Sequence, residues 1–186
     1  DAIVWGTVMF PGHVSISEDN PLEPHLGIDL TPVIDMTEEA SSETGLYVYP
    51  AFDGVVTAVI DGCSVGNTDE HCEKGNVVEI THDMGVVNPV DDETVYYKII
   101  YAFLREGILV TPNQGPESII YKSSVGRMDI NLPGSMTGKK LGKLGNTGNS
   151  KGQHLHFEII RGVQVKGKVV EHILNPKNFL PEYQQN

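Results

Sequence analysis

The sequence predicts an all-β fold, arranged as a sandwich or a strongly bent sheet with little helix. Glycine and proline account for 20 and 11 of the 186 residues and punctuate the whole chain. The runs between them are short and rich in β-branched and aromatic residues. No window repeats apolar residues with the 3.6-residue period of an amphipathic helix. Many short strands separated by turns are typical of proteins built from packed sheets.

Six runs carry the strand pattern, and the chain between them is expected to form turns and loops. These runs are Val55 to Ile60, Val77 to Thr81, Val95 to Leu104, Ile108 to Val110, His154 to Ile160 and Val163 to Val170. One helical turn is expected at residues 175–179, where Pro176 can occupy the start of a helix. Residues 32–44 and 105–124 are predicted to be inserted loops, which either shape a binding cleft or decorate the surface. No repeat or linker is visible, so one domain is expected over residues 1–186.

The charge balance excludes several classes of partner. The formal net charge is −12, which would not neutralise phosphates, so nucleic acid is not an expected partner. Anionic membrane surfaces are excluded for the same reason. No apolar run approaches the roughly 20 residues that span a bilayer. The N-terminus lacks a basic segment followed by an apolar one, so any signal peptide or anchor has been removed or lies outside this sequence.

Two cysteines, Cys63 and Cys72, flank a polar stretch between two predicted strands. A disulfide that closes the base of this hairpin loop is the simplest interpretation, and it implies an oxidising compartment. Two free thiols in a reducing compartment are the alternative. A metal site that uses His71 and Cys72 is less well supported, because two cysteines and one histidine fall short of four ligands.

Two histidine clusters are candidates for chemistry. In extended backbone His25 and Asp29 point the same way, with Gly27 between them, although surface residues show this spacing too. In the second cluster His154, His156 and Glu158 share one face of a strand, while Leu155, Phe157 and Ile159 share the other. The apolar face would pack into the core. The two imidazoles on the opposite face are either metal or catalytic groups, or partly exposed histidines without a ligand.

Combined, the clusters supply a candidate zinc site. His25, Asp29 and one histidine of the pair at 154 and 156 make three ligands, and three protein ligands plus water is the pattern of catalytic zinc. The metal lowers the pKa of such a water towards about 7. The remaining histidine would lie beside it as a general base or as a donor to an oxyanion. A metal-free structural domain is the opposing interpretation, but packing has no need for such a cluster.

The glycine-rich segment that runs into the histidine strand is the most specific motif. Residues 142–159 read Gly-Lys-Leu-Gly-Asn-Thr-Gly-Asn-Ser-Lys-Gly-Gln-His-Leu-His-Phe-Glu-Ile. Together with His25-Leu26-Gly27-Ile28-Asp29, they closely resemble the motifs of the lysostaphin-type, or LytM-like, zinc endopeptidases. Residues 49–56 and 75–85 resemble core strands and turns of that family, and residues 175–180 resemble its closing segment. The resemblance covers residues 22 to 180, interrupted by the two loops.

This resemblance implies a compact antiparallel β fold with a groove and one Zn²⁺ ion. Family members hold zinc through a His and an Asp of the first motif and the second His of His-x-His, which correspond to His25, Asp29 and His156. The first His of that pair, His154 here, is catalytic. Active members hydrolyse peptide bonds in peptidoglycan stems or cross-bridges, often beside glycine.

The chain departs from the family pattern at one position. Active members carry a second catalytic histidine in a Tyr-x-His-Leu stretch, and the matching stretch here is Tyr101-Ala102-Phe103-Leu104. Phe103 has no group that can donate to an oxyanion or carry a proton. Loss of one such donor typically costs on the order of 10²- to 10³-fold in rate. His82 could substitute, but it ends a predicted core strand, where a structural role is expected.

Two functional hypotheses follow for this chain, which is expected to be secreted or to lie in the cell envelope. In the first, it is a zinc-binding module that recognises peptidoglycan, a glycine-containing peptide or an envelope protein without efficient cleavage. In the second, it is an active zinc metalloendopeptidase that cleaves cell-wall cross-links. Phe103 favours the first hypothesis, and the retained His154 favours the second.

Overall fold

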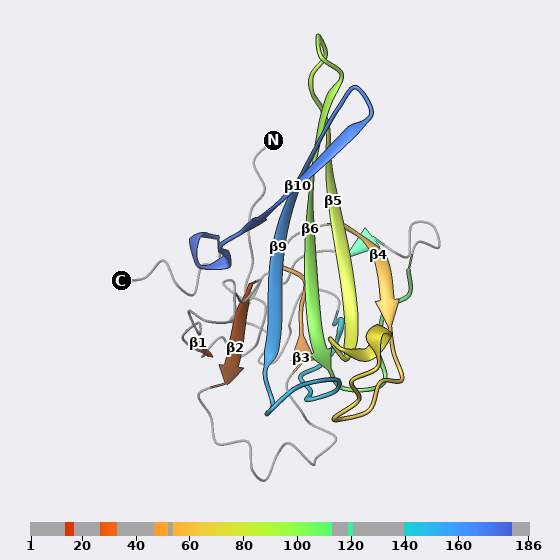
Figure 1. Ribbon diagram of the computed structural model, residues 1–186, viewed down its shortest axis with the longest axis vertical. Coiled ribbons are helices and arrows are strands. Elements are labelled where there is room, and N and C mark those ends of the chain that lie inside the picture. The colour runs from red at the N-terminus through yellow and green to blue at the C-terminus, as the bar shows by residue number, and fades with distance from the viewer. Residues whose placement is uncertain are drawn as a thin grey trace, which may run out of the picture.

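A computed structural model of the chain describes residues 14–16, 27–32, 47–51, 54–112, 119–120 and 140–179. Its elements, shown in Figure 1, are strands apart from two short 3₁₀ helices. The strands are β1 (Val14–Ile16), β2 (Ile28–Pro32), β3 (Tyr47–Val48), β4 (Gly54–Ile60), β5 (Asn76–Asn88), β6 (Glu93–Leu104), β7 (Ile119–Ile120), β8 (Gly142–Lys143), β9 (Leu155–Val165) and β10 (Lys168–Leu174). The 3₁₀ helices are η1 (Glu70–Cys72) and η3 (Pro176–Asn178). The described residues contain no helix with the length and hydropathy of a membrane span.

One large antiparallel sheet forms the body of the described structure. Its order is β1-β2-β9-β6-β5-β4-β7, and β10 also pairs with β9. Strand β9 pairs along one edge with β6, while its other edge pairs first with β2 and then with β10. The small β3–β8 sheet is antiparallel as well. The prediction of an all-β, antiparallel fold with little helix is therefore confirmed.

The hydrophobic core lies between the two sheets. Val48 of β3 and Leu141 beside β8 are completely buried against apolar side chains of the large sheet. On β9 the residues Leu155, Phe157 and Ile159 are also completely buried, so the predicted alternation places this face in the core. The opposite face of the same stretch of β9 is thereby left for the histidines.

Three local predictions differ from the structure: the strand at 108–110, the strand at 163–170 and the loop at 105–124. Residues 108–110 do not form a strand, because their backbone contacts lie outside any ladder: the Ile108 N–H donates to Asp61 Oδ2 at 3.0 Å and the Leu109 N–H donates to the Leu141 carbonyl. The run from 163 to 170 is not one strand but the end of β9 and the start of β10. Lys166 and Gly167 both have positive φ, 48° and 78°, as a two-residue type I′ hairpin turn requires.

The predicted loop at 105–124 also contains β7, a two-residue strand that pairs with β4. The loop predicted at 32–44 lies outside the described residues, apart from Pro32 at the end of β2. The helical turn expected at 175–179 is present as η3. It is capped by Asn175, whose Oδ1 accepts from the Lys177 N–H at 3.0 Å.

A buried polar cluster joins the end of β6 to the glycine-rich segment. Thr147 Oγ1 accepts from the Asn76 N–H at 2.9 Å and donates to the Leu104 carbonyl at 2.7 Å. Asn76 Oδ1 accepts from the Cys63 N–H at 2.8 Å. Cys63 and Cys72 form a disulfide that closes the loop containing η1. These contacts tie the disulfide loop, the end of β6 and the segment leading to β9 into one unit.

We predict that Thr147→Val lowers the free energy of unfolding by about 1–3 kcal/mol, because the buried Asn76 N–H loses its acceptor while the side-chain volume is kept. Urea denaturation monitored by tryptophan fluorescence or circular dichroism measures the change. Thr57→Val is the matched control, because the Thr57 hydroxyl is exposed and bonds to Glu79. Equal, small effects of both substitutions would show that the polar cluster does not stabilise the fold.

Candidate metal centre

Strand pairing brings the predicted metal-site residues of β2 and β9 together. Asp29 lies opposite His156, and Ala102 of β6 lies opposite His156 on its other side. Glu158 follows two residues later on the same face of β9. His156 and Glu158 are 6% and 2% exposed, although both point away from the core face. A polar pair this well buried must be satisfied by specific partners.

The imidazole of His156 lies between two carboxylates. Its Nδ1 lies 2.8 Å from Asp29 Oδ1, and its Nε2 lies 2.8 Å from Glu158 Oε1. The same Glu158 oxygen also accepts from the Lys74 ammonium. Glu158 therefore receives hydrogen bonds from a lysine and from the imidazole, which holds the His156 ring with Nδ1 directed at Asp29.

Electrostatics favour the ionised form of Glu158. Burial raises the pKa of this carboxyl, but hydrogen bonds and charge from His156 and Lys74 outweigh burial, so the net shift of the pKa is downward. Burial likewise lowers the pKa of His156, whereas the hydrogen bonds and negative charges of Asp29 and Glu158 raise it, and the net shift is upward. The two carboxylates beside His156 thus favour the charged form of its imidazole.

His154 is held in a defined orientation beside this pair. Its Nδ1 lies 2.8 Å from the Gly152 carbonyl, and the Ser150 hydroxyl lies 3.3 Å from the same nitrogen. A carbonyl oxygen can only accept, so Nδ1 carries the proton. In the neutral ring Nε2 is then the basic nitrogen, and it lies 3.6 Å from Asp29 Oδ1. This is the arrangement that a general base beside the Asp29–His156 pair requires.

Phe103 lies against both imidazoles. Its ring centroid is 4.9 Å from that of His154 and 5.8 Å from that of His156. Asn76 pairs with Leu104 and Val78 with Tyr101, so three steps along β6 match two along β5, and the extra residue forms a bulge. Phe103 has a φ of 60° at this bulge, a left-handed conformation that bulky residues rarely adopt. Bulges next to active sites often re-aim a side chain, and here the side chain turned towards the histidines is a phenyl ring.

Gly27 permits the close approach of β2 to β9. It has a φ of 127°, and a Cβ at this position would lie 2.5 Å from the Phe157 carbonyl oxygen and 2.9 Å from Glu158 Cγ. The chain that leads into Asp29 therefore passes directly over the residues that orient His156. The glycine between His25 and Asp29 is therefore required by close packing against β9.

For two of the three predicted zinc ligands, Asp29 and His156, the distance between donor atoms can be compared with the coordination geometry of zinc. Zinc binds nitrogen and carboxylate oxygen at about 2.0–2.2 Å, so tetrahedral ligands lie about 3.3 Å apart. The 2.8 Å between Asp29 Oδ1 and His156 Nδ1 fits a shared ion after a small adjustment. A metal-binding histidine usually donates its other N–H to a carboxylate, as His156 can to Glu158. These residues fit zinc.

The third predicted ligand, His25, lies outside the described residues. Within the described ranges, no group of three or more His, Cys, Asp or Glu side chains is arranged to hold a metal ion. His82 lies elsewhere, because it pairs with Tyr97, five positions along β6 from Ala102. At about 3.4 Å per residue this separation is about 17 Å. His82 is therefore too far away to act at the position of Phe103.

Lys74 is the residue of the site that sequence reasoning missed. Its ammonium binds the buried Glu158, and its carbonyl accepts from the Phe103 N–H at 2.9 Å. It precedes Gly75-Asn76, a segment recognised only as a turn before a strand. A lone lysine in a polar loop carries no sequence signal for a contact made across 84 residues of chain.

The described structure is therefore an antiparallel all-β protein with imidazole and carboxylate groups gathered at one end of its central strands. No protein-family model matches the chain. No curated protein sequence matches it either. Among solved structures it is similar to a zinc containing peptidase from Vibrio cholerae, with 23% identity, 92% of this chain and 39% of that chain covered, and a TM-score of 0.45.

A second similar structure is a putative glycyl-glycine endopeptidase lytM from Ruminococcus gnavus ATCC 29149. The identity is 16% and the TM-score 0.48, over 94% of this chain and 58% of that one. The chain thus spans 39% and 58% of the lengths of these two proteins.

We predict that Gly27→Ala lowers the free energy of unfolding by about 2–4 kcal/mol, because the new methyl group overlaps β9 and the backbone must adopt a disfavoured φ. Gly167→Ala is the control: Gly167 also has a positive φ, but no atom lies within 4 Å of its Cβ position. Chemical denaturation of both variants separates the steric overlap from the conformational cost. Equal losses would mean that β2 does not pack on β9 as closely as described.

Proposed function

We propose that this chain is a zinc-binding domain of the lysostaphin-type kind that recognises cell-wall peptide, or an envelope protein, without efficient cleavage. The observation that carries this proposal is the Phe103 ring against His154 and His156. It occupies the place where the family motif has a second catalytic histidine. The sequence resemblance supplies the ancestral activity, hydrolysis of peptide bonds in peptidoglycan.

The metal site of this proposal consists of His25, Asp29 and His156, with one Zn²⁺ ion. When bound, zinc would act as a Lewis acid towards a peptide carbonyl and would lower the pKa of a water molecule at its open position. Asp29 and His156 face each other at 2.8 Å. Glu158 and Lys74 hold the His156 ring in the orientation that binding needs.

The catalytic part of the site is only half complete. His154 retains a basic Nε2 near Asp29, so a proton can be taken from a water molecule or hydroxyl at that position. Hydrolysis also develops negative charge on the carbonyl oxygen of the substrate, and donors directed at that oxygen supply much of the rate. Phe103 presents carbon atoms there, so the oxyanion loses one donor and the surrounding pocket becomes more apolar.

An active zinc metalloendopeptidase is the second candidate. The orientation of His154, fixed by Gly152 and Ser150, favours this second candidate. It places the proton on Nδ1 and leaves Nε2 able to accept a proton, as a general base requires. In this alternative His154 alone would serve as general base and the rate would remain modest.

We further propose that the protein works outside the cytoplasm, in the cell envelope or the extracellular medium. The buried disulfide between Cys63 and Cys72 supports this location, because such bonds persist in oxidising compartments. The peptide partner would be peptidoglycan or a glycine-containing peptide.

Purified protein is expected to bind one zinc ion per chain, and His25→Ala and Asp29→Ala are each expected to lose it. His82→Ala, which lies away from the site, is expected to keep full occupancy. Metal content after dialysis against dilute zinc, measured by inductively coupled plasma mass spectrometry, tests this directly. Equal sub-stoichiometric zinc in wild type and His25→Ala would refute the ligand assignment.

We expect Phe103→His to raise the rate of peptide hydrolysis by about 10²- to 10³-fold, which is the contribution of one oxyanion donor. The assay follows release of amino groups from cross-linked peptidoglycan and from glycine-rich peptides. The double variant Phe103→His/His154→Ala is the control and is expected to fall back to the background rate. Strong activity of the wild type, without a gain in Phe103→His, would favour the endopeptidase alternative.

Lys74→Met is expected to weaken zinc binding by about tenfold, because Glu158 loses its cation and no longer orients His156. Loss of such outer contacts typically costs 10- to 100-fold in metal affinity. Competition with a chromogenic chelator measures the affinity. Lys98→Met is the matched control, since Lys98 pairs with Glu171 elsewhere on the sheet. If the two variants bind zinc equally well, the link through Glu158 has no role.

A further inference from the structure

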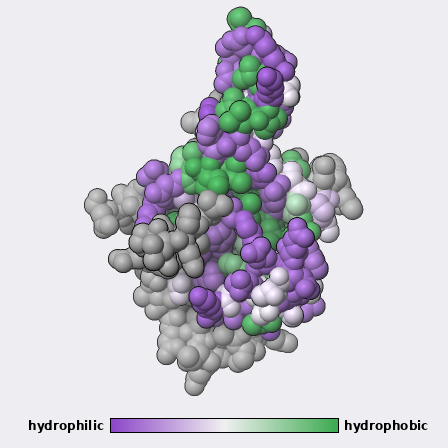
Figure 2. Space-filling model, in the orientation of Figure 1, coloured by the Kyte–Doolittle hydropathy of each residue, from purple (hydrophilic) through white to green (hydrophobic). Residues whose placement is uncertain are grey.

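The β5–β6 and β9–β10 hairpins extend beyond the core cluster as an arm, with turns between Asn88 and Glu93 and between Val165 and Lys168 (Figure 1). The tips of the two hairpins touch through an ion pair between Lys166 and Asp91 at 3.3 Å. Figure 2 shows apolar surface on this arm, among polar residues. Exposed apolar residues on a projecting part of a monomer often mark an interaction site.

One face of the arm continues the core face of the sheet. Val163 of β9 lies opposite Val95 of β6 on one side and Val170 of β10 on the other. Side chains alternate along a strand, so Val163 and Val165 share the face that carries the buried Ile159 further down. Along this row the exposure rises from 4% at Val95 to 54% at Val170.

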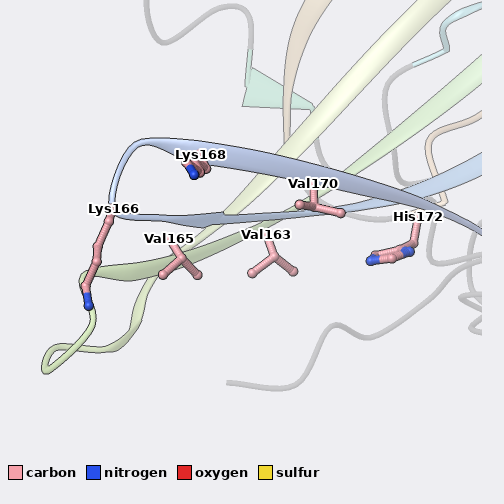
Figure 3. Close-up of a pocket in the computed structure, with 6 residues that line it drawn as sticks. All are labelled: Val163, Val165, Lys166, Lys168, Val170 and His172. Atoms are coloured by element: carbon pink, nitrogen blue, oxygen red, sulfur yellow. The ribbon is translucent and has the colours of Figure 1, made fainter.

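These residues line a hollow of about 520 Å³ on β9 and β10. Figure 3 shows Val163 and Val165 on β9, and Lys168 and His172 on either side of Val170 along β10. Lys168 has no acidic partner among the described residues. The hollow thus combines an apolar floor with a lysine and an imidazole, in a chain whose net charge is −12.

Strand β10 also has an open edge. It pairs with β9 over seven regular positions, and no described strand pairs with its other side. Residues 168–173 are all exposed. An edge strand of this length with unpaired N–H and C=O groups is a template for an added strand. It carries no proline or bulge that would prevent such pairing.

We propose that the edge of β10 binds an extended acidic peptide segment of a partner protein, which adds one strand to the sheet. The segment would set carboxylates beside Lys168 and His172 and an apolar side chain over Val170. Backbone hydrogen bonds supply affinity in this mode, and alternate side chains supply specificity. The proposal does not depend on the metal site, because β10 has no contact with Asp29 or His156 among the interactions described.

A second copy of this chain is a poorer occupant. Antiparallel pairing of β10 with itself, centred on the strand, sets the two Glu171 carboxylates opposite each other, and directly opposed like charges destabilise a sheet. The positive and apolar character of the hollow instead complements an acidic segment.

The order of residues along β10 determines the sequence of a test peptide. The fluorescein-labelled peptide Thr-Val-Glu-Thr-Val-Val-Glu-Thr, run antiparallel, places glutamates opposite His172 and Lys168 and valine opposite Val170. Fluorescence anisotropy with the 186-residue chain should show saturable binding. The variant peptide with both glutamates replaced by lysine should bind at least about tenfold more weakly. A peptide N-methylated at the alternate residues whose N–H groups would face β10 should also bind at least about tenfold more weakly, because it cannot pair with that edge.

Variants of the protein complete the test. Val170→Glu and Lys168→Glu should each weaken binding of the acidic peptide by about tenfold or more, because an apolar contact or an ion pair is lost. Val86→Glu is the matched control, since Val86 has the same 54% exposure on the other hairpin, and it should bind normally. Circular dichroism verifies that each variant is folded.

Several results would overturn the proposal. They are absence of saturable binding, equal binding of the acidic and basic peptides, and unchanged binding by Val170→Glu. Sedimentation velocity without peptide gives one more: a dimer that Val170→Glu dissociates would assign the edge to a second copy. Zinc removal is expected to leave peptide binding unchanged, so failure of the metal site and failure of this surface are distinguishable.

Discussion

The antiparallel pairing of β9 with β6 and β2 is the constraint on which the rest of the molecule depends. It buries Leu155, Phe157 and Ile159 in the core and, on alternate positions, sets His156 and Glu158 against groups from other segments. Core packing and site geometry are therefore two sides of one strand. The ring of His156 is held between Asp29 and Glu158 because the sheet fixes all three backbones, without help from a flexible loop.

Binding of a metal and catalysis are separable in such a site. The groups around His156 form a chain of donors and acceptors that runs from Lys74 through Glu158 and His156 to Asp29. The Phe103 side chain touches the imidazoles only through its ring, while its backbone N–H donates to the Lys74 carbonyl. On the proposed function, a change of the side chain at the β6 bulge would remove an oxyanion donor and leave Asp29 and His156 in place. Such a division would let a domain keep its ion while its hydrolytic activity is lost.

Much of the sheet could be predicted from the sequence, because period-two alternation and turn residues are local signals. The shared face of His156 and Glu158 followed from the same alternation. Other features depend on contacts between distant segments and have no local pattern. Lys74 reaches Glu158 across the sheet, and Thr147 joins Asn76 to Leu104 in the interior. The turn at Lys166 and Gly167 was missed because its flanking valines read as one continuous strand, although the glycine was a usable signal.

Strand β9 is apolar on one face and polar on the other, so its register against β6 matters during folding as well as in the native structure. A slip of one residue against β6 would exchange His156 with Phe157, sending an imidazole into the apolar interior and an aromatic ring towards Asp29. A misaligned sheet would then offer a divalent ion no pair of donors. If Asp29 and His156 hold a zinc ion as proposed, its binding would stabilise the correct alignment by mass action, and the supply of metal would influence the fraction of the chain that pairs correctly.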